Sequence, residues 1–290
     1  MLDHGLCQAT VARPAELAGI GLHNGKPVRL EVAPAPPGTG LRFVRTDLPG
    51  EPEIPVSVAA VRRSPLCTAL EGEPGVTVAT VEHLLAALRG LGVTNALLRL
   101  DGPEVPMGDG SAAAFAGLLA EAGIVPQEGE VSLLTLDCPV SVSHEDAVLV
   151  AIPAEEPRLT YIFAHPHPTV GVQLAEFTPD RDDFRAELAP ARTIGFLADI
   201  ERMRAQGLAL GGSLECAVVI GEEGYVGPLR FPNEVARHKL LDLFGDLALI
   251  PPVKAHVIGL RSGHALNAAL AEALLQAARL DEEVPCGGNR

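Results

Sequence analysis

Residues 231 to 247 place polar side chains at every fourth position among apolar ones. The polar residues at this spacing are Glu234, His238, Asp242 and Asp246, and the apolar ones are Val235, Leu240, Leu241, Leu243 and Leu247. Side chains four residues apart lie on one face of an α-helix, so the four polar side chains would form a single stripe. The pattern predicts a helix from about Pro232 to Asp246, with the proline in the first turn and Gly245 near the end.

An imidazole and a carboxylate one helical turn apart can bind the same metal ion. His238 and Asp242 have this spacing, which is also the spacing of the two histidines on a zincin helix. Two ligands do not make a site, because a hydrolytic metal needs three protein ligands and an open fourth position. Other parts of the chain must therefore supply a third ligand, a base and groups that hold a substrate.

Shorter patterns predict a first domain of strands and helices. Strands are expected within residues 7–45 and 94–100, and helices at 80–90 and 112–122. Thr80 is the expected N-cap of the first helix. Residues 46–75 are rich in proline, glycine and charge, and predict a small insert.

Two turn-rich segments of this domain suggest binding loops at first sight. Gly19 to Lys26 is interpreted as a hairpin connection, because Pro27 stands where a phosphate loop requires Ser or Thr. Residues 101–111 form a Gly- and Pro-rich loop, in which Asp109 and Ser111 can cap the next helix.

Strand patterns restart after a junction at residues 125–130, so a domain boundary is expected there, between residues 1–126 and 127–290. Strands are predicted at 131–136, 147–152, 159–163, 217–220 and 257–260, helices at 197–206, 232–246 and 268–280, and a turn at 261–267. His165 and His167 alternate with prolines and are interpreted as surface residues rather than ligands.

Composition narrows the class of protein. Of the 290 residues, 47% are hydrophobic and 20% are charged, which indicates a folded globular chain. The net charge is −15 and there is no basic tract, so nucleic acid is a poor partner. No apolar run approaches the roughly 18 residues of a membrane span, and residues 1–25 lack a signal-peptide pattern. A cytoplasmic protein without stable membrane insertion is therefore expected.

The five cysteines are Cys7, Cys67, Cys138, Cys216 and Cys286. They are widely scattered and form no CxxC pair, which argues against a disulfide framework and against a thiolate zinc site. Any metal must then be held by histidine and carboxylate.

His83 is the strongest candidate for the third ligand, since Glu82 beside it can act as general base on a metal-activated water. The alternative for this pair is helix capping and surface charge at a helix start.

Four further residues can complete a hydrolytic site. His264, in a glycine-flanked turn, can protonate a leaving group, and Asp246 can orient it. Lys239 and Thr193 can stabilise an oxyanion or a phosphate.

Many separated motifs resemble one family of enzymes. They are Gly19–Lys26, Arg45–Leu48, Leu66–Thr68, Thr80–Leu84, Pro106–Ala113, Arg192–Phe196, Gly211–Ser213, Arg237–Lys239 with Leu241–Asp242, Gly245–Leu247 and Ser262–Asn267. In this order they are similar to the motifs of the UDP-3-O-acyl-N-acetylglucosamine deacetylases, which perform the committed deacetylation of lipid A synthesis. The resemblance spans nearly the whole chain.

The resemblance implies an α+β fold of two domains of similar topology. Each domain would be a sheet with helices on one face, the two packed helix layer to helix layer, with the site between them. Each would carry an insert, and the second one, at about residues 193–222, would form a passage for an acyl chain.

The family's roles fall on matching residues. The resemblance places His83, His238 and Asp242 on zinc, and it makes Glu82 the base and His264 the acid or electrostatic stabiliser of the departing amine. It also implies that Thr193 and Lys239 polarise the amide carbonyl and that Asp246 supports His264.

The implied partner is a UDP-linked acylated amino sugar, bound by Lys239, Arg261, Thr193 and Ile194. A monomer is expected. The chain departs from the family pattern at Ile194, Gly108 and Ala114, which affect pocket packing rather than the chemistry.

Two alternatives stay open. Two histidines and one carboxylate also suit Fe2+. A noncatalytic metal-binding or regulatory protein with the same fold would instead close its metal site with four protein ligands.

Overall fold

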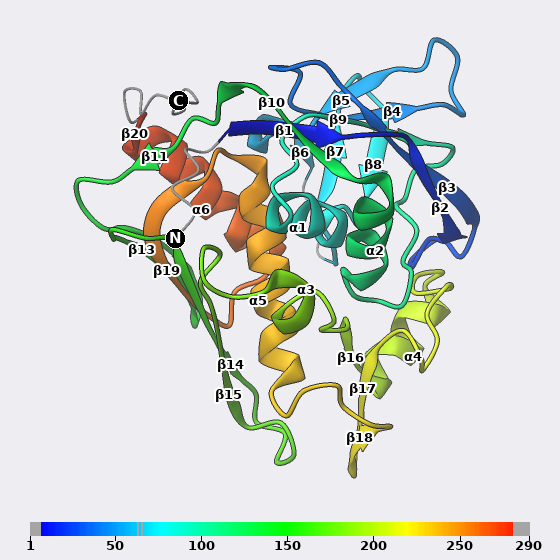
Figure 1. The fold of residues 1–290 in the computed structure, drawn as a ribbon. Helices are drawn as coiled ribbons and strands as arrows, with labels where there is room; N and C mark the ends of the chain where they lie inside the picture. Colours follow the sequence, from blue (N-terminus) through cyan, green and yellow to red (C-terminus); the bar gives the residue numbers. More distant parts are fainter. Residues whose placement is uncertain (1–6, 63, 65, 281–290) are drawn as a thin grey trace.

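The structure, a computed structural model, describes residues 7–62, 64 and 66–280. Cys286 lies outside these residues. The described residues form α-helices and β-sheets in a mixed arrangement, so the expected α+β class is confirmed (Figure 1). None of the helices in this part of the chain is both long and apolar enough to cross a membrane.

The first half of the molecule is built on a five-stranded sheet. Its strand order is β2 (Ala15–Ile20), β3 (Pro27–Pro34), β9 (Ala96–Leu100), β4 (Leu41–Arg45) and β5 (Glu53–Pro55), and only β4 and β9 are parallel. Leu30 and Val32 on β3 point into the core, as the alternating pattern predicts.

Two helices and a small sheet complete this half. The helices are α1 (Glu82–Gly90) and α2 (Ala113–Ala122). The expected insert at 46–75 contains β5, the 3-10 helix η1 (Val58–Ala60), β6 (Val61–Arg62) and β7 (Ala69–Glu71), and β7 also pairs with β8 (Thr77–Ala79).

The second half is built on a seven-stranded sheet. Its strands are β11 (Leu134–Thr135), β12 (Val140–His144), β13 (Ala147–Pro153), β14 (Arg158–Ala164), β15 (Val172–Phe177), β19 (Val253–Leu260) and β20 (Arg279–Leu280). Its helices are α3 (Phe184–Glu187), α5 (Glu234–Asp246) and α6 (His264–Ala277), with the 3-10 helix η2 (Leu247–Leu249) after α5.

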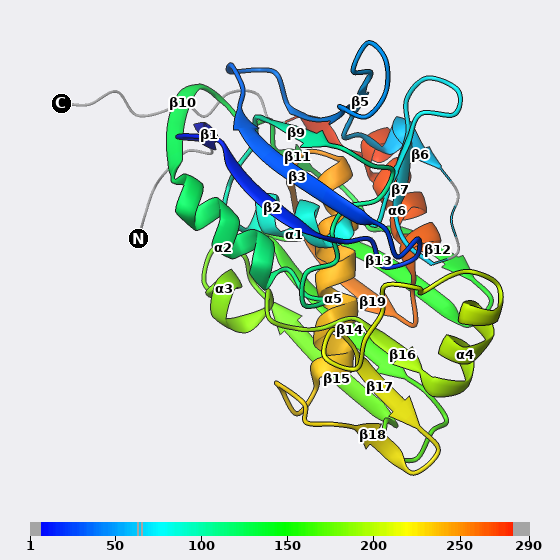
Figure 2. The same ribbon diagram turned by 90° about the vertical axis from the view of Figure 1, so that its right-hand side faces the viewer.

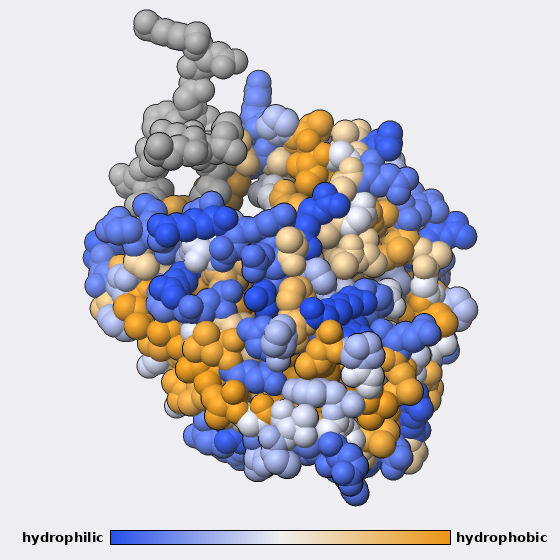
Figure 3. Space-filling view, turned by 60° about the horizontal axis from the view of Figure 1, so that its bottom comes forward, coloured by the Kyte–Doolittle hydropathy of each residue, from blue (hydrophilic) through white to orange (hydrophobic). Residues whose placement is uncertain are grey.

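A separate three-stranded sheet in the second half carries the segment expected to be its insert. It contains β16 (Ile194–Phe196), β17 (Val218–Gly221) and β18 (Gly224–Val226), with α4 (Leu197–Ala205) beside them. Figure 3 shows apolar patches on the face that includes the bottom of Figure 1, where α4, β15 and β18 lie. Exposed large apolar residues in these elements include Leu197, Val172 and Val226, and Leu214 is exposed in the segment between α4 and β17.

The two helix layers meet along α1 and α5, which cross in the centre of the molecule (Figures 1 and 2). Gly245 makes this approach possible, because a Cβ there would lie 2.1 Å from the carbonyl oxygen of Glu82. The helix predicted from the polar stripe is therefore a buried central element rather than a solvated one, since its residues His238, Asp242 and Asp246 are buried.

Three local predictions were wrong. Thr80 is not an N-cap: its φ is +59° and its hydroxyl donates to Glu104 Oε1 at 3.1 Å, and α1 is preceded by Val81 without a side-chain cap. The last helix begins at His264, not at Ala268, so the predicted turn is its first turn. Residues 279–280 of the predicted helix form β20 instead.

The junction expected at 125–130 is an ordered strand. β10 (Ile124–Glu130) pairs antiparallel with β1 (Cys7–Val11). The boundary between residues 126 and 127 stays a prediction.

Candidate metal centre and catalytic site

Three buried side chains from two helices converge in the centre of the molecule. His83 comes from the first turn of α1, and His238 and Asp242 come from α5. One ligand atom from each lies within 4.8 Å of the others. His83 Nε2 and His238 Nε2 lie 3.4 and 3.3 Å from Asp242 Oδ1. The structure thus brings together the three residues expected to bind a metal.

The cluster has the donor set and the spacing for a divalent metal. Asp242 Oδ1 is buried and has no hydrogen-bond partner among the residues that the structure describes. Ligand atoms about 2.0 to 2.1 Å from a tetrahedral metal lie roughly 3.3 to 3.4 Å apart. The two distances to Asp242 agree with this separation, so these residues fit a bound metal.

The charge states of the cluster also suit a metal. Burial lowers the pKa of His238 to about 3, which keeps the imidazole neutral. Its Nδ1 lies 3.2 Å from the carbonyl oxygen of Ala191, which leaves Nε2 facing Asp242. Burial would raise the pKa of Asp242, but His238 and Lys239 outweigh it and hold that pKa well below its usual range. Neutral imidazole and carboxylate are the forms that bind metals.

Lys239 lies against the same carboxylate. Its Nζ donates to Asp242 Oδ2 at 2.7 Å. Burial opposes the charge of Lys239, but Asp242 raises its pKa, so the ammonium stays protonated beside the cluster. It can stabilise a negatively charged oxygen there.

Glu82 is buried at the start of α1, next to the ligand His83. Its Oε2 accepts a hydrogen bond from the backbone N–H of Thr68 at 3.0 Å. Burial raises its pKa, and His264 and His83 oppose that shift. A carboxylate whose pKa is raised towards neutrality is suited to general base catalysis.

His264 faces Glu82 from the other half of the molecule. Its Nε2 lies 3.9 Å from Glu82 Oε1, and its Nδ1 lies 2.9 Å from Asp246 Oδ2. Burial alone would lower its pKa, but Asp246 and Glu82 outweigh burial and raise it to about 9. Asp246 thus orients the ring and stabilises its protonated form.

Sequence reasoning assigned no role to two residues that complete this network. The hydroxyl of Thr68 donates to Asp246 Oδ1, and Asn267 Nδ2 donates to Asp246 Oδ2 at 2.8 Å. Thr68 therefore joins the general-base candidate Glu82 to the carboxylate behind His264. Their only signal in the sequence was membership of the resembling motifs.

Residues of both halves line a cavity of about 380 Å³. Thr193 and Ile194 come from the second half, and Met107 and His23 come from the first. The carbonyl of Gly110 accepts a hydrogen bond from the backbone N–H of Thr193 at 2.7 Å, so the loop before α2 positions this residue.

His23 is a further site residue that the sequence did not indicate, because its segment was interpreted only as a hairpin. Its two ring nitrogens are buried, without a hydrogen-bond partner among the described residues. Burial lowers the pKa of His23, so its ring is neutral.

Other candidates have structural partners. Arg261 follows β19 and pairs with Asp146 at 2.7 Å. His165 stacks on Phe196 with ring centroids 4.2 Å apart, and neither it nor His167 joins the metal cluster.

Glu234, the first polar residue of the α5 stripe, is not part of the site. It forms a buried ion pair with Arg192, with Oε1 2.9 Å from Nε. The four-residue stripe therefore divides into one structural residue and three site residues.

Comparisons with known proteins agree with this geometry. A family model described as UDP-3-O-acyl N-acetylglycosamine deacetylase matches residues 8–276. A protein of Thermosynechococcus vestitus is 46% identical over 272 residues, covering 93% of this chain and 94% of its own length. Proteins of Myxococcus xanthus and Chlamydia abortus are 44% and 39% identical, covering 96% and 93% of this chain and 89% and 97% of their own lengths. All three relatives are named UDP-3-O-acyl-N-acetylglucosamine deacetylase.

Proposed function

Since the chain belongs to the UDP-3-O-acyl-N-acetylglucosamine deacetylase family, we propose that it removes the N-acetyl group from UDP-3-O-acyl-N-acetylglucosamine in lipid A synthesis. The products are the free amine and acetate. The observation that carries the proposal is the convergence of His83, His238 and Asp242 beside the pair Glu82 and His264. This arrangement joins a metal site to a base and an acid from opposite halves of the molecule.

His83, His238 and Asp242 hold the metal, which we assign as Zn2+. When bound by three protein ligands, such a metal acts as a Lewis acid and keeps one coordination position open. The same ligand set also suits Fe2+. A closed structural site would need a fourth protein ligand, and the group of described residues that fits a metal contains three.

Glu82 accepts the proton of the water that attacks the amide carbonyl. Its carboxylate is buried and is fixed by the Thr68 N–H, so it needs little reorganisation to do so. As the carbonyl oxygen gains negative charge, the Lys239 ammonium and the Thr193 hydroxyl stabilise it. The C–N bond then breaks, and His264 donates a proton from Nε2 to the departing amine.

Asp246 and Thr68 act on the reaction through His264, since Asp246 binds its Nδ1 and the Thr68 hydroxyl donates to Asp246. Because Asp246 binds Nδ1, the proton that His264 transfers is the one on Nε2, which faces Glu82. Asp246 is therefore a positioning residue for proton transfer to the amine.

The cavity beside Thr193 and Ile194 receives the acyl chain of the substrate. The exposed apolar residues of the 193–222 segment, such as Leu197 and Leu214, support this role. Arg261 and Lys239 contact the UDP phosphates. The nucleotide-sugar chemistry of the substrate supports a cytoplasmic enzyme, and we propose that it acts as a monomer.

Replacing Glu82 tests the role of the base. Glu82→Gln keeps the shape of the side chain but removes its basicity, and a lost general base lowers turnover by about 10² to 10⁴-fold. We expect acetate release to fall by at least a hundredfold while one metal per chain is retained, as measured by metal analysis. Glu121→Gln, an exposed change on α2, is the matched control and should leave turnover unchanged.

Two results would contradict these assignments separately. Full turnover of Glu82→Gln would remove the general-base role and leave the reaction standing. A wild-type protein that releases no acetate with Zn2+ or Fe2+ restored after chelation would overturn the proposed reaction.

A further inference from the structure

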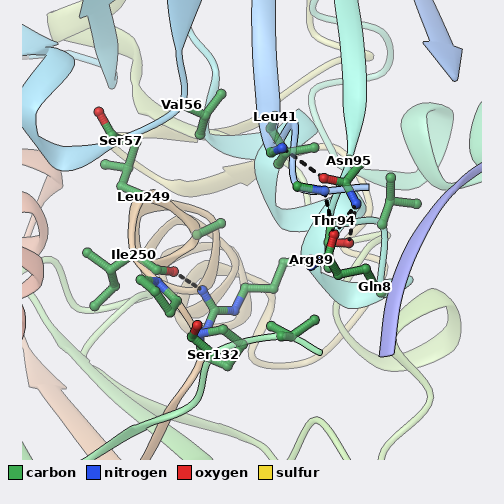
Figure 4. A pocket seen from close by; sticks show the side chains of 18 of the residues that line it. Gln8, Leu41, Val56, Ser57, Arg89, Thr94, Asn95, Ser132, Leu249 and Ile250 are labelled. Atoms are coloured by element: carbon green, nitrogen blue, oxygen red, sulfur yellow. Dashed lines mark hydrogen bonds between the residues drawn. The ribbon is translucent and has the colours of Figure 1, made fainter. Parts of the chain in front are cut away.

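A second cavity, of about 580 Å³, lies between the two halves at the end of α1 that is opposite to Glu82 and His83. Leu41 and Val56 of the first half and Leu249 of the second half line it (Figure 4). None of its lining residues belongs to the metal cluster or its catalytic neighbours. Its volume is in the range of sites that enclose small organic molecules, about 300 to 1,000 Å³.

Arg89, in the last turn of α1, is the cation of this cavity. Its Nη1 donates to the carbonyl oxygens of Leu247 and Ile250 at 2.7 and 3.1 Å, and its guanidinium lies over the Phe244 ring. Within residues 7–62, 64 and 66–280, its Nε and Nη2 have no hydrogen-bond partner and it has no carboxylate within ion-pair distance. Burial lowers the pKa of Arg89 to about 10.

The free nitrogens of Arg89 match one kind of ligand. Nε and Nη2 form one edge of the planar guanidinium, and this edge binds both oxygens of a carboxylate. Arg89 is half-buried, so an anion that enters the cavity forms a charge-assisted pair with this edge in a partly desolvated setting. The two carbonyl bonds on Nη1 fix the orientation of that edge.

The amide and hydroxyl groups on the side of the cavity away from Arg89 have partners. Asn95 Nδ2 donates to Gln8 Oε1 at 2.9 Å, and the Thr94 hydroxyl donates to the carbonyl oxygen of Ala9. Glu130 also lines the cavity, and its carbonyl oxygen accepts from Gln8 Nε2. Figure 4 places Gln8, Thr94 and Asn95 together, apart from the guanidinium of Arg89.

Apolar side chains make up most of the remaining wall. They include Leu41, Val56, Val93, Leu249, Ile250 and Leu275. A ligand that satisfies both Arg89 and this wall carries one negative charge on an apolar body.

We propose that this cavity binds an amphipathic monocarboxylate, with its carboxylate on Arg89 and its hydrocarbon chain against the apolar wall. The site is separate from the metal centre and does not depend on the proposed deacetylation.

The absence of tryptophan from the chain gives a direct test. Leu275 lines the cavity and is 42% exposed, so Leu275→Trp places a single fluorescent reporter at its edge. Titration of the full-length protein with decanoate should change the fluorescence saturably. Decanol has the same chain without the charge and should bind at least tenfold more weakly.

A matched reporter separates this cavity from the one beside Thr193. Leu214 lines that other cavity and is 59% exposed, so Leu214→Trp reports binding there. Adding Arg89→Gln should weaken decanoate binding at least tenfold with the Leu275→Trp reporter. The same change should leave the Leu214→Trp titration unaltered, which also shows that the variant is folded.

A second variant leaves Arg89 in place. Val56→Phe fills part of the cavity and should also weaken binding to the Leu275→Trp reporter, because the chain loses its space. The proposal is overturned if this reporter does not respond to decanoate, if decanol binds as tightly, or if Arg89→Gln leaves its affinity unchanged.

Discussion

Asp242 divides its two carboxylate oxygens between different partners. Oδ1 faces both histidines of the cluster, and Oδ2 accepts the Lys239 ammonium. A metal bound by the cluster would thus contact one oxygen of this carboxylate, while the Lys239 ammonium contacts the other. The position of Lys239 in the sequence, next to His238 and three residues before Asp242, makes this arrangement possible on one helix.

Replacing Thr68 tests how much turnover depends on the hydrogen bonds that hold Asp246 against His264. Thr68→Val keeps the side-chain shape but removes the hydroxyl that donates to Asp246. A loss of about 1.4 kcal/mol in transition-state stabilisation lowers the rate tenfold. We expect kcat to fall about tenfold with little change in KM, measured by acetate release.

Thr68→Ser is the control for this prediction, because it restores the donor and removes only a methyl group. Its kcat should return to within about threefold of wild type. Equal losses in the serine and valine variants would show that the methyl group, not the hydrogen bond, matters.

The ion pair of Glu234 with Arg192 should make a pH-dependent contribution to the free energy of unfolding. Burial would raise its pKa, but hydrogen bonds from Arg192 and from the Arg230 backbone lower it below the ordinary value of 4.5. Because the folded protein depresses this pKa, the stabilisation is fully present above about pH 4.5 and is lost as the pH falls through the lower, folded value.

Glu234→Gln should therefore lower the free energy of unfolding by about 3 kcal/mol at pH 7, as for other broken buried pairs. The difference from wild type should shrink below about pH 4.3, as followed by urea unfolding across the acid range. A difference that stays constant with pH would exclude ionisation of Glu234 as the cause.

At the scale of residues, the sequence predicted the three residues of the candidate metal cluster better than their supporting network. His238 and Asp242 are four residues apart on one helix, so spacing alone placed them together. His83 and His264 lie far away in the chain, and their convergence followed only from family resemblance. Thr68 acts through tertiary contacts that no local pattern encodes.

The crossing of α1 and α5 is the element-scale feature on which the site depends. A methyl group at position 245 would lie 2.1 Å from the Glu82 carbonyl oxygen and 3.3 Å from Ala86 Cβ. Gly245→Ala must therefore separate the two helices. Overpacking of this kind costs about 1 to 3 kcal/mol, and we expect both a lower thermal unfolding temperature and reduced turnover.

Gly117 on α2 provides the matched control. A Cβ there meets no atom within 4 Å, and the residue is helical. Gly117→Ala should stabilise the protein by about 0.4 to 1 kcal/mol and leave turnover unchanged. If both glycine variants behave alike, close approach of α1 and α5 is not what Gly245 provides.

Element boundaries show where local patterns lose their meaning. Threonine is a common N-cap residue, but the hydroxyl of Thr80 donates to Glu104 and its backbone is in the left-handed region. His264 was expected in a turn because glycine precedes it, but Gly263 is the N-cap of α6, which begins at His264. In both cases a tertiary contact or a backbone angle overrides the local preference.

At the scale of the molecule, the candidate metal ligands come from both halves. His83 belongs to the helix layer of the first half, and His238 and Asp242 belong to that of the second. A ligand that binds only the folded state stabilises it by about 4 kcal/mol at a thousandfold excess over Kd. Chelation should therefore lower the unfolding temperature, measured by calorimetry, and zinc should restore it.

His167→Ala is the control for chelation. It removes a histidine of the proline-rich loop, whose ring nitrogens lie within hydrogen-bond distance of the Gly221 carbonyl oxygen and the Thr169 backbone nitrogen. Its unfolding temperature should respond to chelation as wild type does, whereas His238→Ala should not respond. If chelation did not lower the unfolding temperature of His167→Ala, the metal that stabilises the protein would be bound in that loop instead.

The α+β class and the packing of helix layer on helix layer were both expected from the family resemblance, and periodicity alone predicted only the separate strands and helices. Periodicity shows which face of α5 is apolar and cannot show which helix covers it. The polar stripe of α5 is buried because α1 brings matching polar groups to it. Residues 125–130 were interpreted as a junction and not as a strand, because their pairing partner β1 lies more than one hundred positions earlier.

The loop before α2 has a consequence for how this enzyme can change over evolutionary time. Its Met107 lines the cavity beside Thr193, and its Gly110 holds the Thr193 backbone in place. Gly108 lies between them, with a φ of +60° and a position where a Cβ would meet Ala114 at 3.1 Å. Under the roles proposed above for this cavity and for Thr193, a mutation in this loop would alter both the selection of the acyl chain and the catalytic rate, so the two traits would change together rather than one at a time.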